Sequence, residues 1–424
     1  MKIKEIDAKA ILDSRKEKTI FVSIKTNAGI FSASAPNGKS KGKFEAKPYK
    51  KSLNEDIKKV KQLGEYFSKE EFEKFENLRI IEDVADGHIG ANTLFALESA
   101  VLKAIAKEQN PKNFPWENFG ATKSKKEWED FVGKQVWMII NPKAKKFPRF
   151  VGNAVGGGKH SKLISGKKPD FQEFLLIPES NSPEISFEKN ISSKEEIEKI
   201  LKKSDEKFNN TKNDENAWQT SLNEKEVLDI LSNLKNSKFF NSFSKAEDVK
   251  IPIGVDIASS SFFKRKKYNY ENPFLKREPD EQMSYLSNLI KNYNLIYVED
   301  PFNEEDFLNF SRLLKKFPNV LIVGDDLTAT NHKRFLNAIE KKSINAIIVK
   351  PNQNGSLLSV KQICETAREN NIKIVFSHRS GETEENILAD LAFGFQADFF
   401  KCGIDGKERE MKLRRMVEIE ENLR

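Results

Sequence analysis

Two patterns of hydrophobic and polar positions divide the chain. Residues 19–36, TIFVSIKTNAGIFSASAP, alternate apolar and polar side chains about an NAG turn, which predicts a β-hairpin. In the later segment ANTLFALESAVLKAIAKEQNP, apolar residues recur every three or four positions until Pro111, which predicts a helix. Strands followed by helices indicate a compact α+β domain over residues 1–135. The lysine-rich segment NPKAKKFP then fits a boundary to a second domain, residues 136–424.

From residue 251 onward, short apolar segments repeatedly end in a polar residue. The residues at these strand ends are Asp256, Glu299, Asp325, Lys350, His378 and Lys401. The later steps each have about the length of one strand plus one helix, as expected of consecutive βα units. Together with the strand-like segments FPRFVGNAV and FQEFLLIP, they predict a (β/α)8 barrel. Because the first two strands leave no room for a full helix between them, the barrel should open irregularly, with a strand–strand step. Residues 181–224, the most polar part of the chain, are interpreted as loops and solvent-exposed helix.

Composition and charge narrow the class of protein. The chain has only two cysteines, Cys364 and Cys402, neither at metal-ligand spacing, which predicts a reducing, cytoplasmic location without a disulfide framework. The N-terminus lacks the apolar segment of a signal peptide, and no apolar run approaches the roughly 20 residues of a membrane span. The net charge of +8 is modest for 424 residues, and the lysines are dispersed among acids. This pattern argues against nucleic-acid binding as the primary role.

One strand end is unusually rich in polar groups. The segment KIVFSHRSGETEE begins as a short apolar strand and then places His378, Arg379 and Ser380 side by side. Taken alone, it could be a polar loop that caps the next helix, with Ser380 or Thr383 as the N-cap. In a barrel, however, the carboxyl ends of the strands converge on one face, where active sites lie. The polar strand ends would then surround one mouth, which helix capping does not explain.

Three carboxylates at successive strand ends indicate a site for a hard cation. Asp256, Glu299 and Asp325 offer the oxygen ligands that Mg²⁺ prefers. Asp256 and Asp325 could instead cap the helices that follow them, but Glu299 is a poor helix cap. Zinc is disfavoured, because no clustered His or Cys accompanies the carboxylates.

The basic strand ends add a base and an anion site. Neighbouring cations and desolvation lower the pKa of a lysine, so Lys350 or Lys401 could act as a general base while the other holds an anion. Arg379 and Ser380 offer the planar donors and the hydroxyl that suit a phosphate. The combination indicates abstraction of a proton beside a carboxylate on a small phosphorylated acid.

Several long segments resemble those of the enolase family. They are ILDSR, APNGKSKGKFEA, GANTLFALESAVLKAIA, VGNAVGGGKHSK with FQEFLLIP, VEDPFNEEDF, GDDLTATNHKR, VKPNQNGS and SHRSGETEE, and they run nearly from end to end. The resemblance implies an irregular (β/α)8 barrel of enolase type with an N-terminal α+β capping domain. It implies a glycolytic lyase that interconverts 2-phospho-D-glycerate and phosphoenolpyruvate, with two Mg²⁺ per active site, the second arriving with the substrate. A cytoplasmic homodimer or larger homo-oligomer is also implied.

The same resemblance implies a role for individual residues. The first Mg²⁺ would be held by Asp256, Glu299 and Asp325, and the second by Ser40 in a mobile loop. The catalytic set would be Lys350 as base, Glu215 as acid, Glu173 assisting it, and His160 and His378 beside them. The substrate would be held by Gln172, Ser377, Arg379, Ser380 and Lys401, the last at the substrate carboxylate.

Three loops depart from the usual pattern of the family. LDSRKEKT stands where LDSRGNPT is usual, and NGKSK replaces SGAST, which adds Lys39 and Lys41. Asn216 and Ala217 replace two glycines after Glu215, and Ala217 would be strained if its position requires a positive φ. These departures leave open an enolase-like protein with weakened catalysis and a binding or structural role. Another lyase of the superfamily would need a different group at the phosphate end.

Overall fold

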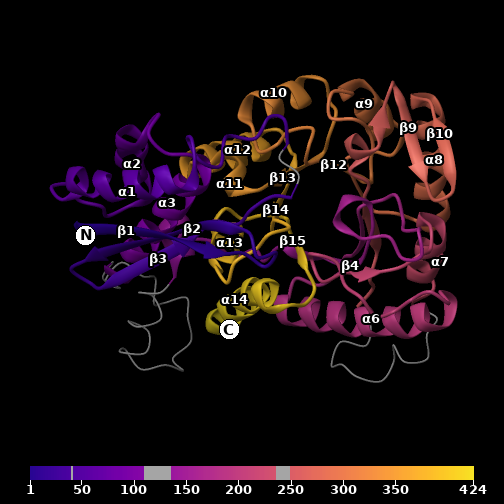
Figure 1. Ribbon diagram of the computed structural model, residues 1–424, viewed down its shortest axis with the longest axis horizontal. Helices are drawn as coiled ribbons and strands as arrows, with labels where there is room; N and C mark the ends of the chain where they lie inside the picture. Colours follow the sequence, from indigo (N-terminus) through magenta and orange to yellow (C-terminus); the bar gives the residue numbers. More distant parts are fainter. Residues whose placement is uncertain (40–41, 109–134, 235–248) are drawn as a thin grey trace.

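A computed structural model describes residues 1–39, 42–108, 135–234 and 249–424 of the chain. Figure 1 shows a small N-terminal unit of strands and helices beside a larger barrel that holds the rest of the chain. The boundary expected after residue 135 stays a prediction, because it adjoins a segment outside the described residues. None of the described helices is long and apolar enough to cross a membrane.

The N-terminal unit packs an antiparallel sheet against helices. The sheet has the order β1 (Ile3–Leu12), β2 (Lys18–Thr26) and β3 (Ile30–Ser34). The helical elements are α1 (Leu53–Phe67), η1 (Phe75–Asn77), α2 (Leu78–Ala85) and α3 (Ala91–Glu108). The expected hairpin is β2 with β3, and the expected helix is α3. The alternating residues Ile20, Val22 and Ile24 are fully buried, which explains why this segment forms a strand.

Eight of the described strands close into the barrel. They are β4 (Arg149–Gly156), β5 (Glu173–Leu176), β7 (Ile253–Asp256), β11 (Tyr297–Glu299), β12 (Leu321–Gly324), β13 (Ala346–Val349), β14 (Lys373–Ser377) and β15 (Phe399–Gly403). β15 pairs in parallel with β4 and closes the ring. β5 runs antiparallel to both β4 and β7, which confirms the expected strand–strand opening. A two-residue strand, β6 (Trp218–Gln219), also pairs with β4.

Helices surround the barrel in the order of the chain (Figure 1). They are α5 (Val136–Ile140), η4 (Gly158–His160), α6 (Pro183–Ser204), α7 (Glu224–Ser232), η7 (Ser259–Ser261), α8 (Pro279–Tyr293), α9 (Phe307–Lys316), α10 (His332–Glu340), α11 (Pro351–Asn354), α12 (Leu357–Glu369), α13 (Ile387–Gly394) and α14 (Lys407–Leu423). A small separate sheet is formed by β8 (Phe263–Lys264), β9 (Lys267–Glu271) and β10 (Phe274–Arg277).

Helix α6 corrects the interpretation of residues 181–224 as loops and solvent-exposed helix. One face of α6 is buried, and this face includes the polar residues Lys189, Asn190 and Lys194. The segment looks solvent-exposed in sequence because polar side chains occupy positions that face the protein interior.

The alternation of side chains along the strands determines which residues reach the mouth of the barrel. Alternate strand residues fill the barrel interior, among them Ala346 and Ile348 of β13. Successive side chains of a strand point to opposite faces, so Lys350 follows Ile348 on the inward face, one layer above it. The same two-residue spacing from an interior apolar residue places Glu299, Asp325, Ser377 and Lys401 at the mouth. The packed apolar interior therefore lies directly below the polar groups and supports them.

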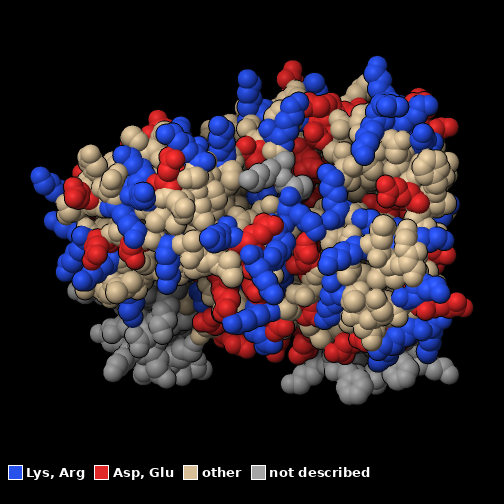
Figure 2. All heavy atoms as spheres, in the orientation of Figure 1, with Lys and Arg blue, Asp and Glu red and all other residues tan. Residues whose placement is uncertain are grey.

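Charges of both signs are spread over the face of the molecule that Figure 2 shows. Figure 2 shows Lys and Arg intermingled with Asp and Glu over the face in view. The dispersal of lysines among acids along the sequence thus recurs in space on this face.

Candidate active site

A cavity of about 270 Å³ opens at the carboxyl ends of the barrel strands. Loop residues of the N-terminal unit, Gly38, Lys39 and Glu45, close one side of it. The expected site residues that line it are His160, Gln172, Glu173, Glu215, Asp256, Asp325, Lys350, Ser377, His378, Arg379, Ser380 and Lys401. Glu299 is fully buried directly beside it, against Lys401. Ser40 lies outside the described residues.

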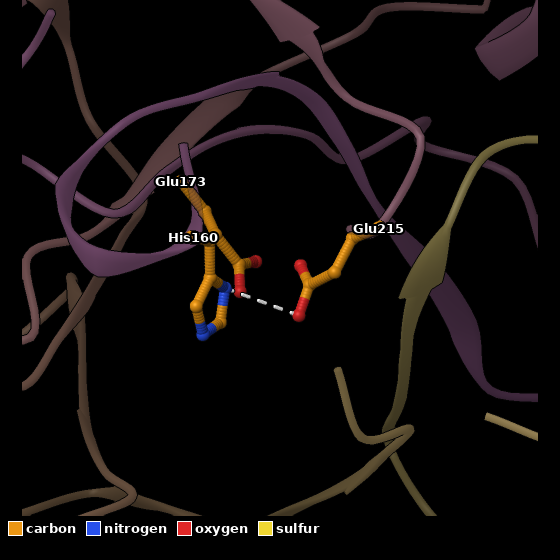
Figure 3. Close-up of side chains that lie close together, drawn as sticks. All are labelled: His160, Glu173 and Glu215. Carbon is orange, nitrogen blue, oxygen red and sulfur yellow. Dashed lines mark ion pairs between the residues drawn. The ribbon is translucent and has the colours of Figure 1, made fainter. Parts of the chain in front are cut away.

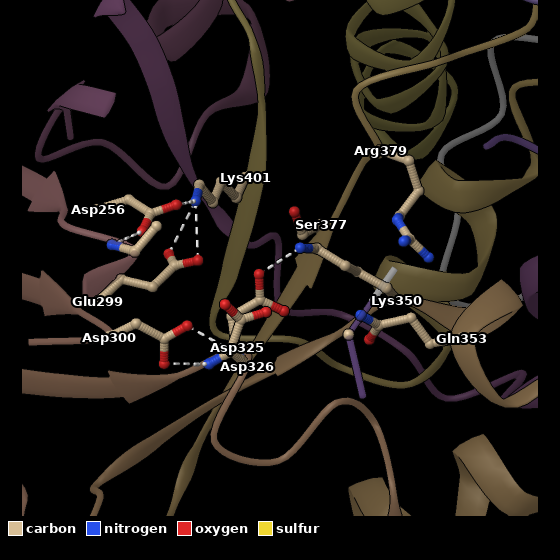
Figure 4. A network of polar contacts seen from close by, with 12 residues as sticks. Asp256, Glu299, Asp300, Asp325, Asp326, Lys350, Gln353, Ser377, Arg379 and Lys401 are labelled. Carbon is tan, nitrogen blue, oxygen red and sulfur yellow. Dashed lines mark hydrogen bonds and ion pairs between the residues drawn. The ribbon is translucent and has the colours of Figure 1, made fainter. Parts of the chain in front are cut away.

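Lys401 stands at the centre of a group of buried carboxylates (Figure 4). Its Nζ donates to Asp256 Oδ2 and to both oxygens of Glu299 at 2.9 Å, and it lies 3.2 Å from Glu173 Oε2. Burial lowers the pKa of Lys401, but the surrounding carboxylates outweigh it and raise the pKa well above its ordinary value. Burial and the adjacent Asp256 raise the pKa of Glu299 to about 8. This part of the site holds one ammonium between several acids.

Lys350 forms a second, separate ion pair. Its Nζ donates to Asp325 Oδ2, and its backbone N–H donates to Thr330 Oγ1 at 2.9 Å. Burial disfavours the charge on both side chains, yet their attraction lowers the pKa of Asp325 and raises that of Lys350. The lysine is therefore held in its charged form by the carboxylate it faces.

Asp300 holds the strand end that carries Asp325. Its Oδ1 accepts the backbone N–H of Asp325 at 3.1 Å, and its Oδ2 accepts that of Asp326 at 2.7 Å (Figure 4). Burial and the acidic neighbours raise the pKa of Asp326 to about 7. Asp300 is 2 % exposed, so these bonds are made out of water and fix the backbone there.

The acidic groups at the mouth suit a hard divalent cation. Asp325 Oδ1 is buried and has no hydrogen-bond partner, so one ligand oxygen is free for a metal. Ligand atoms of Asp300, Asp325 and Asp326 all lie within 4.8 Å of one another. Of the expected ligands, Asp325 faces Lys350, whereas Asp256 and Glu299 face Lys401.

Glu215 is the centre of a third group, formed by residues far apart in the sequence (Figure 3). Its carboxylate lies 3.2 Å from His160 Nδ1 and 3.8 Å from His378 Nε2, and it accepts a hydrogen bond of 3.0 Å from Asn153 Nδ2. Glu173 projects into the same space.

The two carboxyl groups of this cluster differ in their environments. Burial raises the pKa of Glu173 well above its ordinary value, although Lys401 opposes the effect. Burial also opposes ionisation of Glu215, but the nearby His160 outweighs it and holds the pKa well below its ordinary value. Burial lowers the pKa of His378 well below its ordinary value, so this imidazole is neutral. A pair of carboxyl groups with opposite shifts is typical of acid–base sites.

Arg379 is paired with a carboxylate from the N-terminal unit. Its Nη2 donates to Glu45 Oε2 at 2.9 Å and Oε1 at 3.1 Å, and its Nη1 donates to Asn352 at 3.2 Å. Ser380 Oγ accepts the backbone N–H of Lys39 at 2.8 Å and a bond of 3.2 Å from Arg15. The donors expected to hold a phosphate are therefore collected in one corner of the cavity.

The remaining expected substrate groups are also placed. Gln172 Nε2 donates to Asp256 Oδ2 at 3.3 Å, and Ser377 Oγ donates to the carbonyl of His378 at 3.0 Å. Both residues line the cavity.

Comparison with known proteins identifies the family. The family model described as "Enolase, C-terminal TIM barrel domain" matches residues 144–424. The enolase of Sulfurisphaera tokodaii is 35% identical over 99% of this chain and 95% of its own length. The enolase of Archaeoglobus fulgidus is 30% identical over 99% of this chain and 98% of its own. That of Pyrobaculum aerophilum is 40% identical over 65% of this chain and 64% of its own length. This chain belongs to the enolase family.

Two of the three loops that depart from the usual enolase pattern place a residue other than glycine at a positive φ angle. Lys16, in LDSRKEKT, has φ 63°. Asn216 also has φ 63°, whereas Ala217 is not among the positive-φ residues, so the condition under which Ala217 would be strained is not met. Asn tolerates this conformation better than most residues, because its short side chain bonds locally. The loop that carries Glu215 therefore keeps its turn by using Asn216.

Sequence reasoning missed several residues of this enolase site. They are Glu45, Asn153, Asp300 and Asp326. Asp300 and Asp326 could have been found, since each directly follows an expected ligand in VEDP and GDDL. Glu45 and Asn153 gave no such signal, because nothing local shows that they meet Arg379 and Glu215.

Proposed function

We propose that this protein is an enolase, a lyase that interconverts 2-phospho-D-glycerate and phosphoenolpyruvate plus water. The observation that carries the proposal is the arrangement around one cavity. The same cavity is lined by a lysine, Lys350, by a pair of carboxyl groups with opposite pKa shifts, Glu173 and Glu215, and by Arg379 and Ser380. Elimination of water needs a base, an acid on the leaving hydroxyl and donors that hold the phosphate, and these residues are the proposed candidates for the three roles.

Lys350 is the proposed base that removes the C2 proton. An ammonium cannot accept a proton, so the ion pair that Lys350 makes with Asp325 has to be relieved before the reaction. The backbone N–H of Lys350 donates to Thr330, which fixes the backbone there. The lysine side chain can therefore shift toward the substrate without movement of the strand end.

Glu215 is the proposed acid that protonates the departing 3-hydroxyl, with Glu173 beside it. An acid must carry a proton, and in this pair the environment of Glu173 favours the protonated form. The two carboxyl groups lie with His160 in one cluster, so a proton held at Glu173 is close to Glu215. We infer that the pair works as a unit, in which His160 and His378 hold Glu215 in position.

The substrate would be bound at its two anionic ends. Arg379 and Ser380 would hold the phosphate, which has to replace Glu45 at the guanidinium. Lys401 would stand at the carboxylate end, with Gln172 and Ser377 completing the pocket wall.

The residues present fit a divalent metal, and we propose Mg²⁺. Asp256, Glu299 and Asp325 would hold one ion, and Ser40 a second that arrives with the substrate. Bound Mg²⁺ supplies positive charge for the electrons that accumulate at the substrate carboxylate when the C2 proton leaves. The free Oδ1 of Asp325 and the all-oxygen donor set support this choice.

We also propose that the protein is a cytoplasmic homodimer or larger homo-oligomer, as the resemblance implies. Light scattering on the purified protein would give its mass in solution, and a monomer at micromolar concentration would contradict this part of the proposal.

Turnover of 2-phosphoglycerate tests the function directly. Phosphoenolpyruvate formation is followed by ultraviolet absorbance with Mg²⁺, without added metal and in excess chelator. We expect turnover only with the metal. A folded protein that binds Mg²⁺ but does not turn over this substrate would instead support a binding or structural role.

A further inference from the structure

Hydrogen bonds to Asn213 close the turn that carries Glu215. The Asn213 backbone N–H donates to the Ala217 carbonyl at 2.9 Å, and the Asn213 carbonyl accepts the backbone N–H of Asn216 at 3.0 Å. The Asn213 side chain accepts the backbone N–H groups of Glu215 at 2.9 Å and of Ala217 at 3.0 Å. Asn216, which stands where the family has a glycine, has φ 63°, and its carbonyl accepts none of the described backbone hydrogen bonds outside helices and strands. Asn216 is half-buried, and a carbonyl shielded from water without a partner is costly, so a side chain that bonds this carbonyl stabilises the turn.

Lys194 of helix α6 provides this contact. Its Nζ donates to the carbonyl oxygen of Asn216 and to Asp405 Oδ1 at 2.6 Å. Its own carbonyl accepts the indole N–H of Trp218 at 3.1 Å. The side chain of Lys194 is only 3% exposed, so both bonds are made in a water-poor environment where they count most.

The loop after β15 completes the support. The Asn216 side chain donates to the carbonyl of Asp405 at 3.2 Å. A Cβ at Gly406 would lie 1.8 Å from Asn216 Nδ2, so glycine is required for this close approach. Lys194, Asp405 and Asn216 thus tie α6, the Glu215 loop and the end of β15 together.

We propose that Lys194 is a positioning residue for the elimination step, which acts on Glu215 through the Asn216 carbonyl. The inference rests on the function proposed above for Glu215. Lys194 does not face the cavity, so it does not touch the substrate or the groups that form the base and phosphate sites. Its loss should therefore disturb the acid and leave proton abstraction by Lys350 in place.

The chain offers a matched control in Lys212. Its Nζ bonds Asp405 Oδ2 at 2.8 Å and lies 4.7 Å from the centre of the Trp218 ring, much as Lys194 lies 5.6 Å from it. Lys212 makes no bond to the Asn216 carbonyl among the described contacts, however. Lys194→Met and Lys212→Met each remove one of the two ammonium groups that bond Asp405. In either variant, Asp405 keeps the other lysine as its partner.

Two rates are measured for each variant. The first is formation of phosphoenolpyruvate, and the second is exchange of the C2 hydrogen of 2-phosphoglycerate with deuterated solvent. Small misplacements of a catalytic group can cost up to about 100-fold in rate. We expect Lys194→Met to slow elimination by roughly 10-fold to 100-fold while exchange stays within about twofold. Lys212→Met should leave both rates near those of the parental protein.

The outcomes separate this inference from the function on which it rests. A parental protein that shows neither rate overturns the function, and the inference falls with it. An active parental protein whose Lys194→Met variant loses both rates together, or neither, overturns the inference alone. If Lys194→Met does not fold by circular dichroism, Lys194→Gln is measured in its place, because its shorter, uncharged side chain cannot replace the ammonium that bridges the Asn216 carbonyl and Asp405. Elimination should again be slowed more than exchange, and equal effects on the two rates would overturn the inference.

Discussion

The cavity has two sides that are built in different ways. On the barrel side, Lys350 and Asp325 directly follow short strands and Lys401 lies within β15, so strand register fixes all three above a packed interior. On the loop side, the groups are fixed by side-chain bonds between distant segments, such as the pair of Lys39 Nζ and Asp214 Oδ2 at 2.5 Å.

The loop side contains an exposed pair as well as buried ones such as Arg379 with Glu45, whose side chains are 5% and 10% exposed. Lys401 and Glu299 are almost completely buried, whereas Lys39 is 39% exposed and Asp214 31%. Charge pairs in water contribute little and are screened by salt, while removing one partner of a buried pair leaves an uncompensated charge. Lys39, one of the departures from the usual enolase pattern, belongs to this exposed pair. The following predictions test this contrast.

The largest effect should follow from replacing the base on the barrel side. Lys350→Ala removes the group that takes the C2 proton, so neither exchange nor elimination should proceed, with a loss of at least about 10²–10⁴-fold in both. Glu215→Gln should keep exchange and lose elimination. Both rates are read on one sample by mass spectrometry and ultraviolet absorbance. Exchange in Lys350→Ala would show that another group is the base.

The next effect concerns the metal. Asp325→Asn should weaken Mg²⁺ binding by more than about 10-fold to 100-fold, because even residues behind a ligand have effects of that size. Isothermal titration of Mg²⁺ measures the binding without reference to activity. The matched variant is Asp326→Asn, which changes a neighbouring acid outside the proposed ligand set. Equal losses in the two variants would favour the cluster of Asp300, Asp325 and Asp326 over the proposed ligands.

A smaller effect is expected from relieving backbone strain on the loop side. Lys16 adopts φ 63°, a conformation that costs an L-residue about 1–2 kcal/mol and glycine almost nothing. Lys16→Gly should therefore raise the free energy of unfolding by about 0.5–1 kcal/mol, since the added entropy of glycine in the unfolded chain offsets part of the gain. Urea denaturation measures the shift. Lys18→Gly, in strand β2, is the control and should be destabilising; a lower urea midpoint for Lys16→Gly as well would contradict the strain.

The smallest effect concerns the exposed pair of Lys39 and Asp214. A double-mutant cycle with Lys39→Ala and Asp214→Asn should give a coupling energy of about 0.2–1 kcal/mol that falls as salt is raised to about 0.15 M. Two added lysines near an anionic substrate, Lys39 and Lys41, would raise its rate of association at low salt, but Lys39 is paired with Asp214 and Lys41 lies outside the described residues.

The salt dependence of kcat/KM distinguishes these two views. Asp214→Asn frees Lys39 and should steepen the salt dependence, whereas Lys39→Ala combined with Lys41→Thr should flatten it. Identical salt profiles for the parental protein and both variants would show that neither lysine acts on the substrate.

Sequence reasoning located the barrel side well and the loop side poorly, for a physical reason. Each strand-end group follows an apolar run whose period is visible locally, so Lys350 and Lys401 could be placed at one mouth before any coordinates. The bond of Arg379 to Glu45 and that of Lys194 to Asn216 join segments with no common pattern. Such contacts depend on tertiary packing alone.

The missed elements follow the same rule. Strand β1 (Ile3–Leu12) is exposed at many positions, so its apolar alternation is weak. Strand β10 of the small sheet has exposed residues such as Phe274 and Leu275, and it therefore lacks the buried pattern of a barrel strand. The burial of helix α6 was not predicted, because buried polar residues, Lys194 among them, interrupt its apolar face.

The closure of the barrel by β15 also bears on how the protein is made. Phe399 of β15 pairs with Arg149 of β4, and Gly381 forms a β-bridge with Asn37 of the N-terminal unit. Pairings between such distant segments form slowly, and a growing chain keeps the edge of β4 unpaired until its last strand has left the ribosome. Open strand edges promote aggregation. A chain that stops before β15 lacks both Lys401 and the strand that protects β4, so such a fragment should collect in the insoluble fraction of cells.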